Sequence, residues 1–405
     1  MPGSSTSYDV IVIGGGPIGL ATAHELTKRS TSTLVLEQFT FFNQLGSSAG
    51  RSRQFRFPYP EPYMVQLVKN SVPFWDELQS LTRAPLQDTV GTLWFGDPSV
   101  HSTEGNIAAA EKALTSLNIP FSTLTAAQIE AEYNFRDLPE TYIGLFQPDG
   151  ASIDLAATCQ VLYDANASSP LVAMVPEAPV IDIENAGSAF TVTTPAGTFS
   201  AGKLVLAPGP YADMVFALLG FTIEATYWNM ASAYYRVTTP GIQYPTWFVF
   251  QNPIGDNGNE FYGFPDVSWD HPGYVRVASD FVIHPLDSPA ERTPIPNPQE
   301  LAYTAAWVRD HMTGLEAVPS YASTCLMALS TIPNKELLID FAPPYVPGNE
   351  NVVVYATGWA GKFVPLLGRI LADLALDGTT PFDVSHFALG STYFKPLAPG
   401  WEPSA

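Results

Sequence analysis

Residues 8–37, YDVIVIGGGPIGLATAHELTKRSTSTLVLE, contain the pattern that decides the fold. The β-branched apolar run 8–13 predicts a buried strand that enters a turn at three consecutive glycines. Residues 17–29 predict a helix, with Pro17 in its first turn and apolar residues at helical spacing behind it. Residues 33–36 predict a second strand, which ends at Glu37. A strand, a helix and a second strand in this order indicate a parallel sheet covered by helices.

The turn after the first strand has the pattern Gly14-x-Gly16-x-x-Gly19. In this context Gly14 permits the tight turn, Gly16 lets the backbone approach a pyrophosphate, and Gly19 allows close packing of helix on strand. The helix N-terminus then faces the phosphates, and Glu37 can accept hydrogen bonds from ribose hydroxyls. The alternative is a glycine-rich turn with a solvated glutamate. The pattern predicts a dinucleotide site and does not by itself distinguish FAD from NAD.

Two later segments have the same character as the first strand. Residues 203–207 and 352–356 are apolar runs that lead into Pro-Gly and Thr-Gly. We expect all three strands to share one sheet assembled from distant parts of the chain, and this arrangement favours FAD over NAD. Residues 225–285 are rich in aromatic and β-branched residues, and their alternation predicts antiparallel sheet with long loops. A helix is expected at 299–309.

These elements predict an α/β fold. We expect a discontinuous, Rossmann-like FAD-binding domain and a second, mixed and largely antiparallel β domain that binds the substrate. The expected boundaries are 1–85, 150–222 and 322–390 for the FAD-binding domain, 86–149 and 223–321 for the substrate domain, and 391–405 for a C-terminal tail.

Composition excludes several classes of protein. The chain has 405 residues, 39 of them acidic and 18 basic, and a formal net charge of -21. Its 46% hydrophobic and 14% charged residues exclude intrinsic disorder, which combines low hydrophobicity with high charge. Because the chain is acidic and has no basic stripe, we expect no nucleic-acid partner. No uninterrupted apolar run approaches the roughly 18 residues of a membrane span, so no membrane partner is expected.

The ends of the chain and its cysteines lead to further expectations. The first residues lack a signal-peptide pattern and the last three are PSA rather than SKL, so we expect a soluble intracellular, cytoplasmic protein. We expect it to be a monomer or a small homo-oligomer. Cys159 and Cys325 have no metal or redox spacing, and the histidines are dispersed, so no metal site is expected. A disulfide between the two cysteines is left open.

Residues 46–59, GSSAGRSRQFRFPY, place three of the scarce arginines within six residues. Arg51, Arg53 and Arg56 after a loop of small residues suit an anionic ligand. The ligand could be a phosphate, a flavin or a substrate carboxylate, which arginine can hold with two hydrogen bonds. The alternative is a surface turn whose arginines pair with nearby acids.

The chain resembles the monomeric sarcosine oxidase family. The resemblance rests on the glycine turn, the arginine loop 46–59, the run FYGFP at 261–265, and the segment ATGWAGKF at 356–363. That family includes N-methyltryptophan, pipecolate and fructosyl-amino-acid oxidases, within the wider D-amino-acid oxidase-like flavoproteins. The motifs occur in the same order over almost the whole chain, although the substrate-domain matches are looser.

The resemblance implies substrate-binding roles. Arg56 and Lys362 would together hold the substrate carboxylate, and Arg53 would lie near the flavin ring. Tyr262 would pack against the substrate amine, although an aromatic residue of a YGFP turn can equally be a core residue. For Lys362, the alternative is a solvated lysine.

The glycine pattern and the resemblance together define the expected cofactor contacts. They are Gly14, Gly16, Pro17, Ile18, Gly19, Glu37, Gln38, Ser47, Gly50, Arg51, Ser52, Arg53, Gln54, Val180, Ala207, Gly209, Cys325, Met327, Gly358, Trp359, Gly361 and Lys362. Cys325 resembles the cysteine that joins the flavin 8-methyl group through a thioether, so we expect covalent FAD. A lone cysteine in an apolar stretch can also be simply buried.

Three positions depart from the family pattern. Arg276 stands where the family has a lysine that is thought to help oxygen react with reduced flavin; a solvated strand residue is the alternative. Asp280 stands where the sarcosine enzymes have histidine, and Met327 replaces a tyrosine. An inward-facing Asp280 would favour a substrate with an additional cationic or hydroxyl group, so sarcosine itself is not the expected substrate.

The sequence therefore predicts an FAD-dependent oxidase of an amino acid or N-substituted amino acid. Hydride transfer from the C–H bond to flavin would yield an imine, water would hydrolyse it, and O2 would reoxidise the flavin to give hydrogen peroxide. One alternative is an NAD(P)H-dependent flavin monooxygenase, but those enzymes usually have Gly-Asp where this chain has Gly358-Trp359. Another is a non-catalytic flavin-binding subunit.

Overall fold

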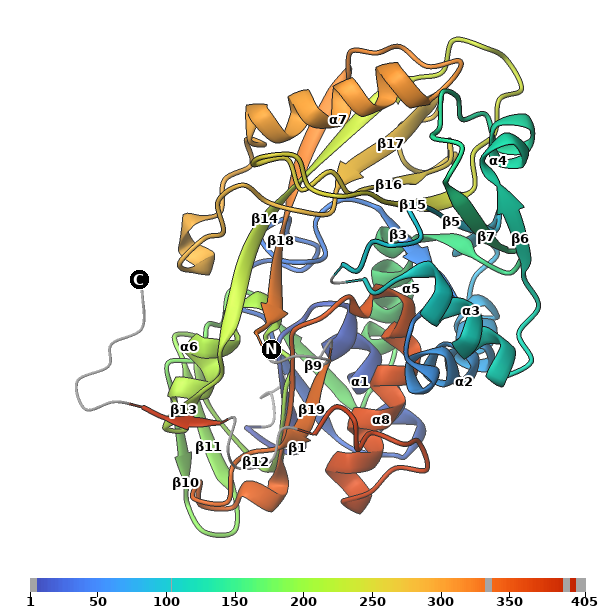
Figure 1. Ribbon diagram of the computed structural model, residues 1–405. Helices are drawn as coiled ribbons and strands as arrows, with labels where there is room; N and C mark the ends of the chain where they lie inside the picture. Colours follow the sequence, from blue (N-terminus) through green and yellow to red (C-terminus); the bar gives the residue numbers. More distant parts are fainter. Residues whose placement is uncertain (1–5, 103, 332–336, 389–393, 398–405) are drawn as a thin grey trace.

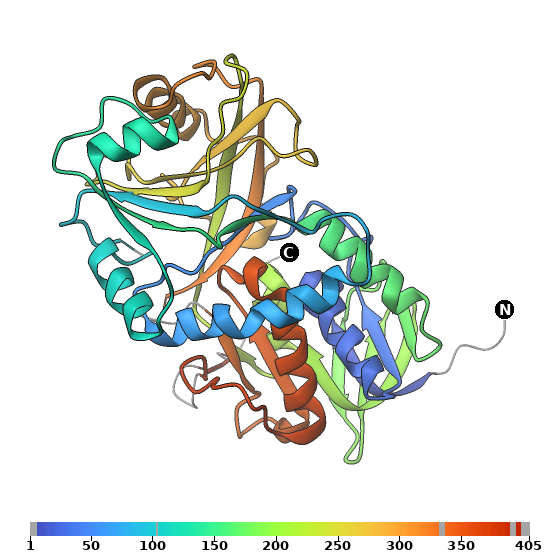
Figure 2. The same ribbon diagram turned by 90° about the vertical axis from the view of Figure 1, so that its right-hand side faces the viewer.

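The computed structural model describes residues 6–102, 104–331, 337–388 and 394–397. Its strands form two large sheets that lie in the lower and upper halves of Figure 1, with the long strands of the second sheet reaching down toward the first. Most helices of the lower half lie on one side of the first sheet, to the right in Figure 1 and toward the viewer in Figure 2. Helix α6 (Ala212–Ala217) packs on the opposite side.

The first sheet has a parallel centre. Its strands are β9 (Val172–Val175), β2 (Thr33–Leu36), β1 (Ser7–Ile13), β12 (Gly197–Leu206) and β20 (Val352–Ala356), followed by antiparallel β19 (Leu338–Phe341). A hairpin of β10 (Asp182–Asn185) and β11 (Phe190–Thr194) pairs with the first half of β12. The prediction that β1, β12 and β20 share one sheet is confirmed. Residues 10–13, 204–206 and 352–356 of these strands are buried on both faces, and each of these parts appears in the sequence as a continuous apolar run.

Three helices lie against this sheet: α1 (Pro17–Lys28), α5 (Leu155–Ala167) and α8 (Val364–Asp377). A fourth, α2 (Pro62–Gln79), packs on α8. Helix α1 contacts both α5 and α8. A side chain at Gly368 of α8 would come within 2.5 Å of the backbone carbonyl carbon of Ala21, so only glycine lets α8 approach α1 this closely. This packing fixes α1, whose N-terminus follows the glycine turn.

The second sheet is antiparallel except where β15 pairs with β5. Its order is β18 (Tyr321–Ser330), β14 (Ala225–Arg236), β17 (Tyr274–Ser279), β16 (Phe261–Phe264), β15 (Thr246–Phe250), β5 (Thr92–Gly96), β7 (Ile143–Gln147) and β6 (Ser122–Thr125). Helix α7 (Pro298–His311), at the top of Figure 1, packs on this sheet. Its Trp307 stacks on Trp247 with ring centroids 4.8 Å apart. The predicted antiparallel region and the predicted helix are both confirmed.

The remaining elements are short. They are the sheet of β3 (Ser52–Phe55), β8 (Ala151–Asp154) and β4 (Gln87–Thr89), the pair β13 (Phe221–Thr222) and β21 (Lys395–Pro396), helices α3 (Ile107–Ser116), α4 (Ala126–Tyr133) and α6 (Ala212–Ala217), and the 3-10 turns η1 (Gly209–Tyr211), η2 (Pro289–Glu291), η3 (Asn349–Asn351) and η4 (Ala360–Phe363). Strand β3 is part of the arginine loop 46–59 and lies between the two large sheets.

The predicted domain boundaries stay a prediction. All residues of strand β18 except Tyr321 lie in the 322–390 segment expected in the FAD-binding domain, yet the strand pairs along its whole length with β14 of the second sheet. Of the expected tail, residues 391–393 and 398–405 lie outside the described residues, whereas β21 pairs with β13. Within the described ranges, both cysteines are free, no group of metal-binding side chains is found, and no helix is long and apolar enough to cross a membrane.

Candidate active site

A cavity lies where the carboxyl ends of β1, β2, β12 and β20 meet the second sheet. It encloses about 1480 Å³, including the open space at its mouth, and residues of both large sheets line it. The predicted residues that line it are Gly14, Gly16, Pro17, Ile18, Glu37, Gln38, Ser47, Arg53, Gln54, Arg56, Ala207, Gly209, Tyr262, Arg276, Asp280, Cys325, Met327, Gly358, Trp359, Gly361 and Lys362. The cavity therefore joins the glycine turn to the candidate substrate residues.

The glycine turn has the geometry of a dinucleotide cradle. Gly14 has φ +112°, and a Cβ atom there would lie 2.2 Å from the carbonyl oxygen of Ala207. A Cβ atom at Gly19 would lie 1.8 Å from the carbonyl oxygen of Gly14, so strand and helix need glycine to pack together. At Gly16, in contrast, a Cβ atom would meet no described protein atom within 4 Å. The open space therefore lies at the N-terminus of α1, where phosphates bind in this type of turn.

Glu37 closes the other side of this turn. Its carboxylate accepts hydrogen bonds from the backbone N–H groups of Gly15 (2.8 Å) and Phe39 (2.9 Å). Burial raises the pKa of Glu37, and the two N–H donors counteract part of that effect. Glu37 is thus held at the carboxyl end of β2, on the cavity wall, where a ribose hydroxyl could reach it.

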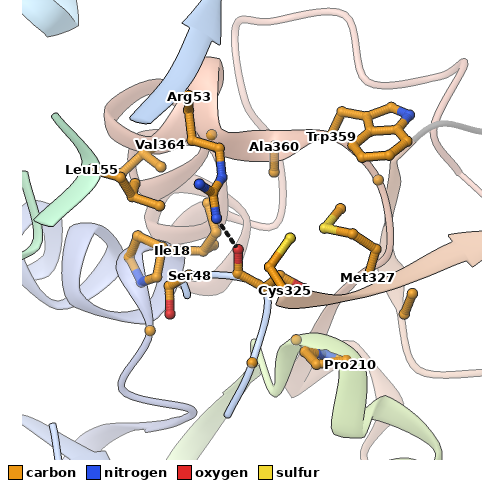
Figure 3. A pocket seen from close by; sticks show the side chains of 18 of the residues that line it. Ile18, Ser48, Arg53, Leu155, Pro210, Cys325, Met327, Trp359, Ala360 and Val364 are labelled. Carbon is orange, nitrogen blue, oxygen red and sulfur yellow. Dashed lines mark hydrogen bonds between the residues drawn. The ribbon is translucent and has the colours of Figure 1, made fainter. Parts of the chain in front are cut away.

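Arg53 fixes the wall between the glycine turn and the second sheet. Its guanidinium donates to the carbonyl oxygens of Ser47 (2.6 Å), Ala49 (2.7 Å) and Ser52 (2.8 Å). Burial lowers the pKa of Arg53. Figure 3 shows its side chain pointing toward the part of the cavity that Cys325 also borders. The loop before β3 is therefore folded around a cation that faces the cavity.

Cys325 and Met327 border the same opening from β18. Both side chains are buried, and Figure 3 shows their sulfur atoms near Trp359 and Arg53. The thiol of Cys325 forms no disulfide. Its position on the cavity wall is compatible with the predicted thioether, which the structure does not test.

Arg56 and Lys362 lie at one end of the cavity and share the ring of Tyr59. The Lys362 ammonium donates to the Tyr59 hydroxyl (2.6 Å) and to the carbonyl oxygen of Trp359 (3.2 Å). The Arg56 guanidinium lies 4.8 Å from the Tyr59 ring and 5.0 Å from the Trp94 ring. Each cation is about 95% buried, which excludes the alternative that Lys362 is solvated.

Two carboxyl groups face this pair of cations. Glu104 forms a buried ion pair with Arg56. Asp280 is 5% exposed, and its Oδ2 atom has no hydrogen-bond partner within the described residues. Burial raises the pKa of Asp280 well above its ordinary value, the acids Glu104 and Glu260 add to this effect, and Arg56 and Lys362 oppose it. An unsatisfied buried carboxyl atom indicates a place for a donor group of a ligand.

Arg276 and Tyr262 also line the cavity. Arg276 donates to the carbonyl oxygen of Ser52 (2.8 Å) and to the Ser232 hydroxyl (3.0 Å), and it lies 4.6 Å over the Phe264 ring. It is 5% exposed, so the solvated alternative is excluded. Burial raises the pKa of Tyr262, which keeps its hydroxyl protonated.

Some predicted contacts lie outside the cavity lining. They are Gly19, Gly50, Arg51, Ser52 and Val180. Arg51 pairs with Asp154 (2.8 Å), as in the surface-turn alternative, and the Ser52 hydroxyl donates to Asp270 (2.7 Å).

Other residues around the cavity were not predicted. Glu104, Phe248 and Phe264 line it, and Tyr59 holds Lys362. Tyr59 is the last residue of the arginine loop, three positions after Arg56, and this proximity of an aromatic residue to a cation is the signal that could have identified it. Glu104 stands in a loop without any motif.

Comparison with known proteins identifies the family. A family model described as FAD dependent oxidoreductase matches residues 9–374. The crystal structure of NikD, an unusual amino acid oxidase essential for nikkomycin biosynthesis, is 37% identical, covers 97% of this chain and 100% of its own, and superposes with a TM-score of 0.89.

Two curated relatives extend the comparison. A putative bifunctional amine oxidase of Dictyostelium discoideum is 32% identical over 94% of this chain, which spans only 37% of that protein's length. Human peroxisomal sarcosine oxidase is 26% identical over 94% of this chain and 95% of its own. The matched family model, the glycine turn and the cavity that opens from it agree: this chain belongs to the FAD dependent oxidoreductase family.

Proposed function

We propose that this chain is an FAD-dependent oxidase that oxidises the CH–NH group of an amino acid or N-substituted amino acid to an imine and passes the two electrons to O2, with release of hydrogen peroxide. The observation that carries the proposal is the pair of buried cations, Arg56 and Lys362, in the cavity that opens from the glycine turn. Names of relatives support it, since NikD and the human protein are described as amino acid and sarcosine oxidases.

The cavity wall fits FAD. The carboxylate of Glu37 offers a partner for the adenosine ribose, the space at Gly16 for the pyrophosphate, and the guanidinium of Arg53 for the flavin. The chemistry that FAD supplies when bound is acceptance of a hydride from a C–H bond and transfer of the two electrons to O2.

Arg56 and Lys362 orient the substrate. Both cations contact Tyr59, so both can bind the same substrate carboxylate. The two parallel N–H donors of the arginine fix the orientation of that carboxylate. Glu104 already balances the charge of Arg56, so a substrate with a second acidic group is disfavoured. The remaining part of the substrate would contact the aromatic walls formed by Tyr262, Phe248 and Phe264, which exclude water.

Asp280 handles the proton of the amine. In its ionised form the carboxylate of Asp280 would accept a proton from a bound ammonium group, and its raised pKa makes that transfer more favourable than to an ordinary aspartate. Its Oδ2 atom is also the acceptor that an N–H or hydroxyl group of the substrate would satisfy. This gives the chain a candidate base and favours substrates with such a donor.

Cys325 would anchor the cofactor. The buried thiol on the cavity wall supports a thioether to the flavin, which the resemblance implies. Arg276 would assist the oxygen reaction as a fixed positive charge in place of the family lysine, because its guanidinium lines the same cavity.

Anaerobic mixing tests the proposal. Amino acids and their N-methyl forms should bleach the yellow flavin absorbance without NAD(P)H, and air should restore it with one peroxide formed per flavin. Bleaching by NAD(P)H but by no amine would indicate the monooxygenase alternative and refute the oxidase.

A further inference from the structure

Asp270 is a buried acidic residue close to the buried Arg276. It is 4% exposed, does not line the cavity, and precedes β17 in the tight turn 266–273. The turn is held by a hydrogen bond from the Gly273 N–H group to Asp266 (2.8 Å) and places His271 at φ +52°. A non-glycine residue in the left-handed region needs surrounding contacts to keep it there.

The carboxylate of Asp270 has partners on two strands and on the neighbouring residue of its own turn. Its Oδ2 atom accepts from the Ser52 hydroxyl (2.7 Å) of β3 and the Tyr234 hydroxyl (3.4 Å) of β14. Its Oδ1 atom lies 3.1 Å from Nδ1 of His271, whose ring packs on Tyr234 with centroids 4.3 Å apart. These contacts fix the direction of the carboxylate.

Ser52 links this carboxylate to Arg276. Its hydroxyl donates to Asp270, and its backbone carbonyl accepts from Nη1 of Arg276 at 2.8 Å. Nη2 donates to the Ser232 hydroxyl, so both terminal nitrogens of the guanidinium are held. The third nitrogen, Nε, is buried and has no hydrogen-bond partner among the described residues. An N–H group of this kind, on a residue that lines the cavity, is available to a ligand.

The two charges also stabilise each other. A buried cation is costly unless an opposite charge compensates it. Burial by itself raises the pKa of Asp270, but Arg276 and the hydrogen bonds from Ser52 and His271 hold it below its ordinary value, so the carboxyl group is ionised. For Arg276, burial acts to lower the pKa, but Tyr234, Tyr262 and Asp270 together raise it.

We propose that Asp270 is a positioning residue for Arg276: it compensates the buried guanidinium, orients it through Ser52, and thereby sets how fast the reduced enzyme reacts with O2. The last clause rests on the proposed function of Arg276. Asp270 itself touches neither the cavity nor its ligands, so its effect must pass through Arg276.

A double-mutant cycle tests this. The holoenzyme is reduced by substrate and mixed with O2, and the rate constant of flavin reoxidation is measured for Asp270→Asn, Arg276→Met and the double variant. We expect a loss of about 100-fold for Arg276→Met, comparable with removal of one electrostatic group from an active site, and about 10-fold for Asp270→Asn. The double variant should equal Arg276→Met alone, because coupled residues are non-additive. A further 10-fold loss in the double variant would overturn the proposal.

Controls separate positioning from damage to the turn. Asp266 is exposed and accepts the hydrogen bond that holds the same turn, so Asp266→Asn should leave the rate unchanged. Ser52→Ala removes only the hydroxyl that donates to Asp270 and should slow reoxidation about 3-fold, less than the loss in Asp270→Asn. If Asp270→Asn does not fold, Ser52→Ala still decides. An unchanged rate in Ser52→Ala would then refute the role of the link.

A readout independent of turnover is the arginine Nε–H resonance in NMR spectra of the oxidised holoenzyme labelled with ¹⁵N-arginine. The resonance lost in Arg276→Met identifies Arg276. It should move in Asp270→Asn and stay in place in Asp266→Asn; an unmoved resonance in Asp270→Asn contradicts positioning. If Arg276→Met reoxidises at the normal rate, the oxygen role of Arg276 fails, while the NMR result still decides whether Asp270 positions it.

Discussion

Replacing Gly16 by alanine separates the folding of the glycine turn from its binding of the cofactor. A Cβ atom at Gly16 meets no described protein atom within 4 Å, and the backbone has φ -72° and ψ -178°, which alanine adopts without strain. Alanine is a poorer N-cap than glycine by a few tenths to about 1 kcal/mol, and the smaller entropy of its unfolded chain offsets about 0.4–1 kcal/mol. The stability of the flavin-free protein should therefore change by less than about 1 kcal/mol.

The same methyl group would occupy the space that the pyrophosphate needs. If it displaces two charge-assisted hydrogen bonds of about 1.5–3 kcal/mol each, the loss is at least about 3 kcal/mol, or about 100-fold in FAD affinity. The assay is fluorescence titration of FAD into flavin-free protein in a Cys325→Ser background, which prevents covalent attachment. Thermal unfolding of the same samples reports stability.

Gly19→Ala is the matched control in the same turn. Its Cβ atom would lie 1.8 Å from the carbonyl oxygen of Gly14, so the variant should lose stability rather than affinity alone. Gly16→Ala protein that binds FAD as tightly as the parent would refute the placement of the pyrophosphate. Unfolded Gly16→Ala protein would refute the claim that the space is free.

The remaining predictions concern the substrate end, the anchor and pH. Arg56→Ala should raise KM for carboxylate substrates about 100-fold through loss of a bidentate ion pair, whereas Arg51→Ala, in the same loop but outside the cavity lining, should not; an unchanged KM in Arg56→Ala would remove it from the site. Acid-precipitated protein should stay yellow because of Cys325, and colour that passes wholly into the supernatant would reject the thioether. Burial raises the pKa of Glu260 to about 8, so the folded protein binds this proton more tightly than the unfolded chain does. The stability that the proton contributes is present below the ordinary glutamate range and is lost as pH rises through about 8. In denaturant titrations the free energy of unfolding of Glu260→Gln should therefore exceed that of the parent by on the order of 2 kcal/mol at pH 9 and by little at pH 4. An equal difference at both pH values would contradict burial as the cause of the raised pKa of Glu260.

Local patterns predicted the elements that position the cofactor. The apolar runs of β1 and β20 lead into glycine turns, the run of β2 ends at Glu37, and α1 has Pro17 at its start, so each is recognisable within a short window. Because the segments of β1, β12 and β20 are all apolar runs that lead into a turn with glycine, the sequence also predicted that they share one sheet. The end of β12 was predicted, but its first residues, which pair with a hairpin, lack that apolar pattern.

The polar partners inside the cavity could not be predicted in the same way. Tyr59 and Lys362 are 303 positions apart, and Glu104 is 48 positions from Arg56. Such pairs depend on how the two sheets meet, which no local pattern reports. The resemblance brought Arg56 and Lys362 together, but Glu104 and Asp270 match no motif, and only the folded structure shows that each compensates a buried arginine.

The most direct test of the central claim is a peroxide assay of the purified yellow protein with amino acids, their N-methyl forms and their glycated forms. We predict that at least one carboxylate-bearing amine yields hydrogen peroxide in equal amount to the O2 consumed, without NAD(P)H, and that Arg56→Ala lowers kcat/KM for it about 100-fold. Absence of peroxide and of flavin reduction with every such amine, from protein that retains FAD, would contradict the account.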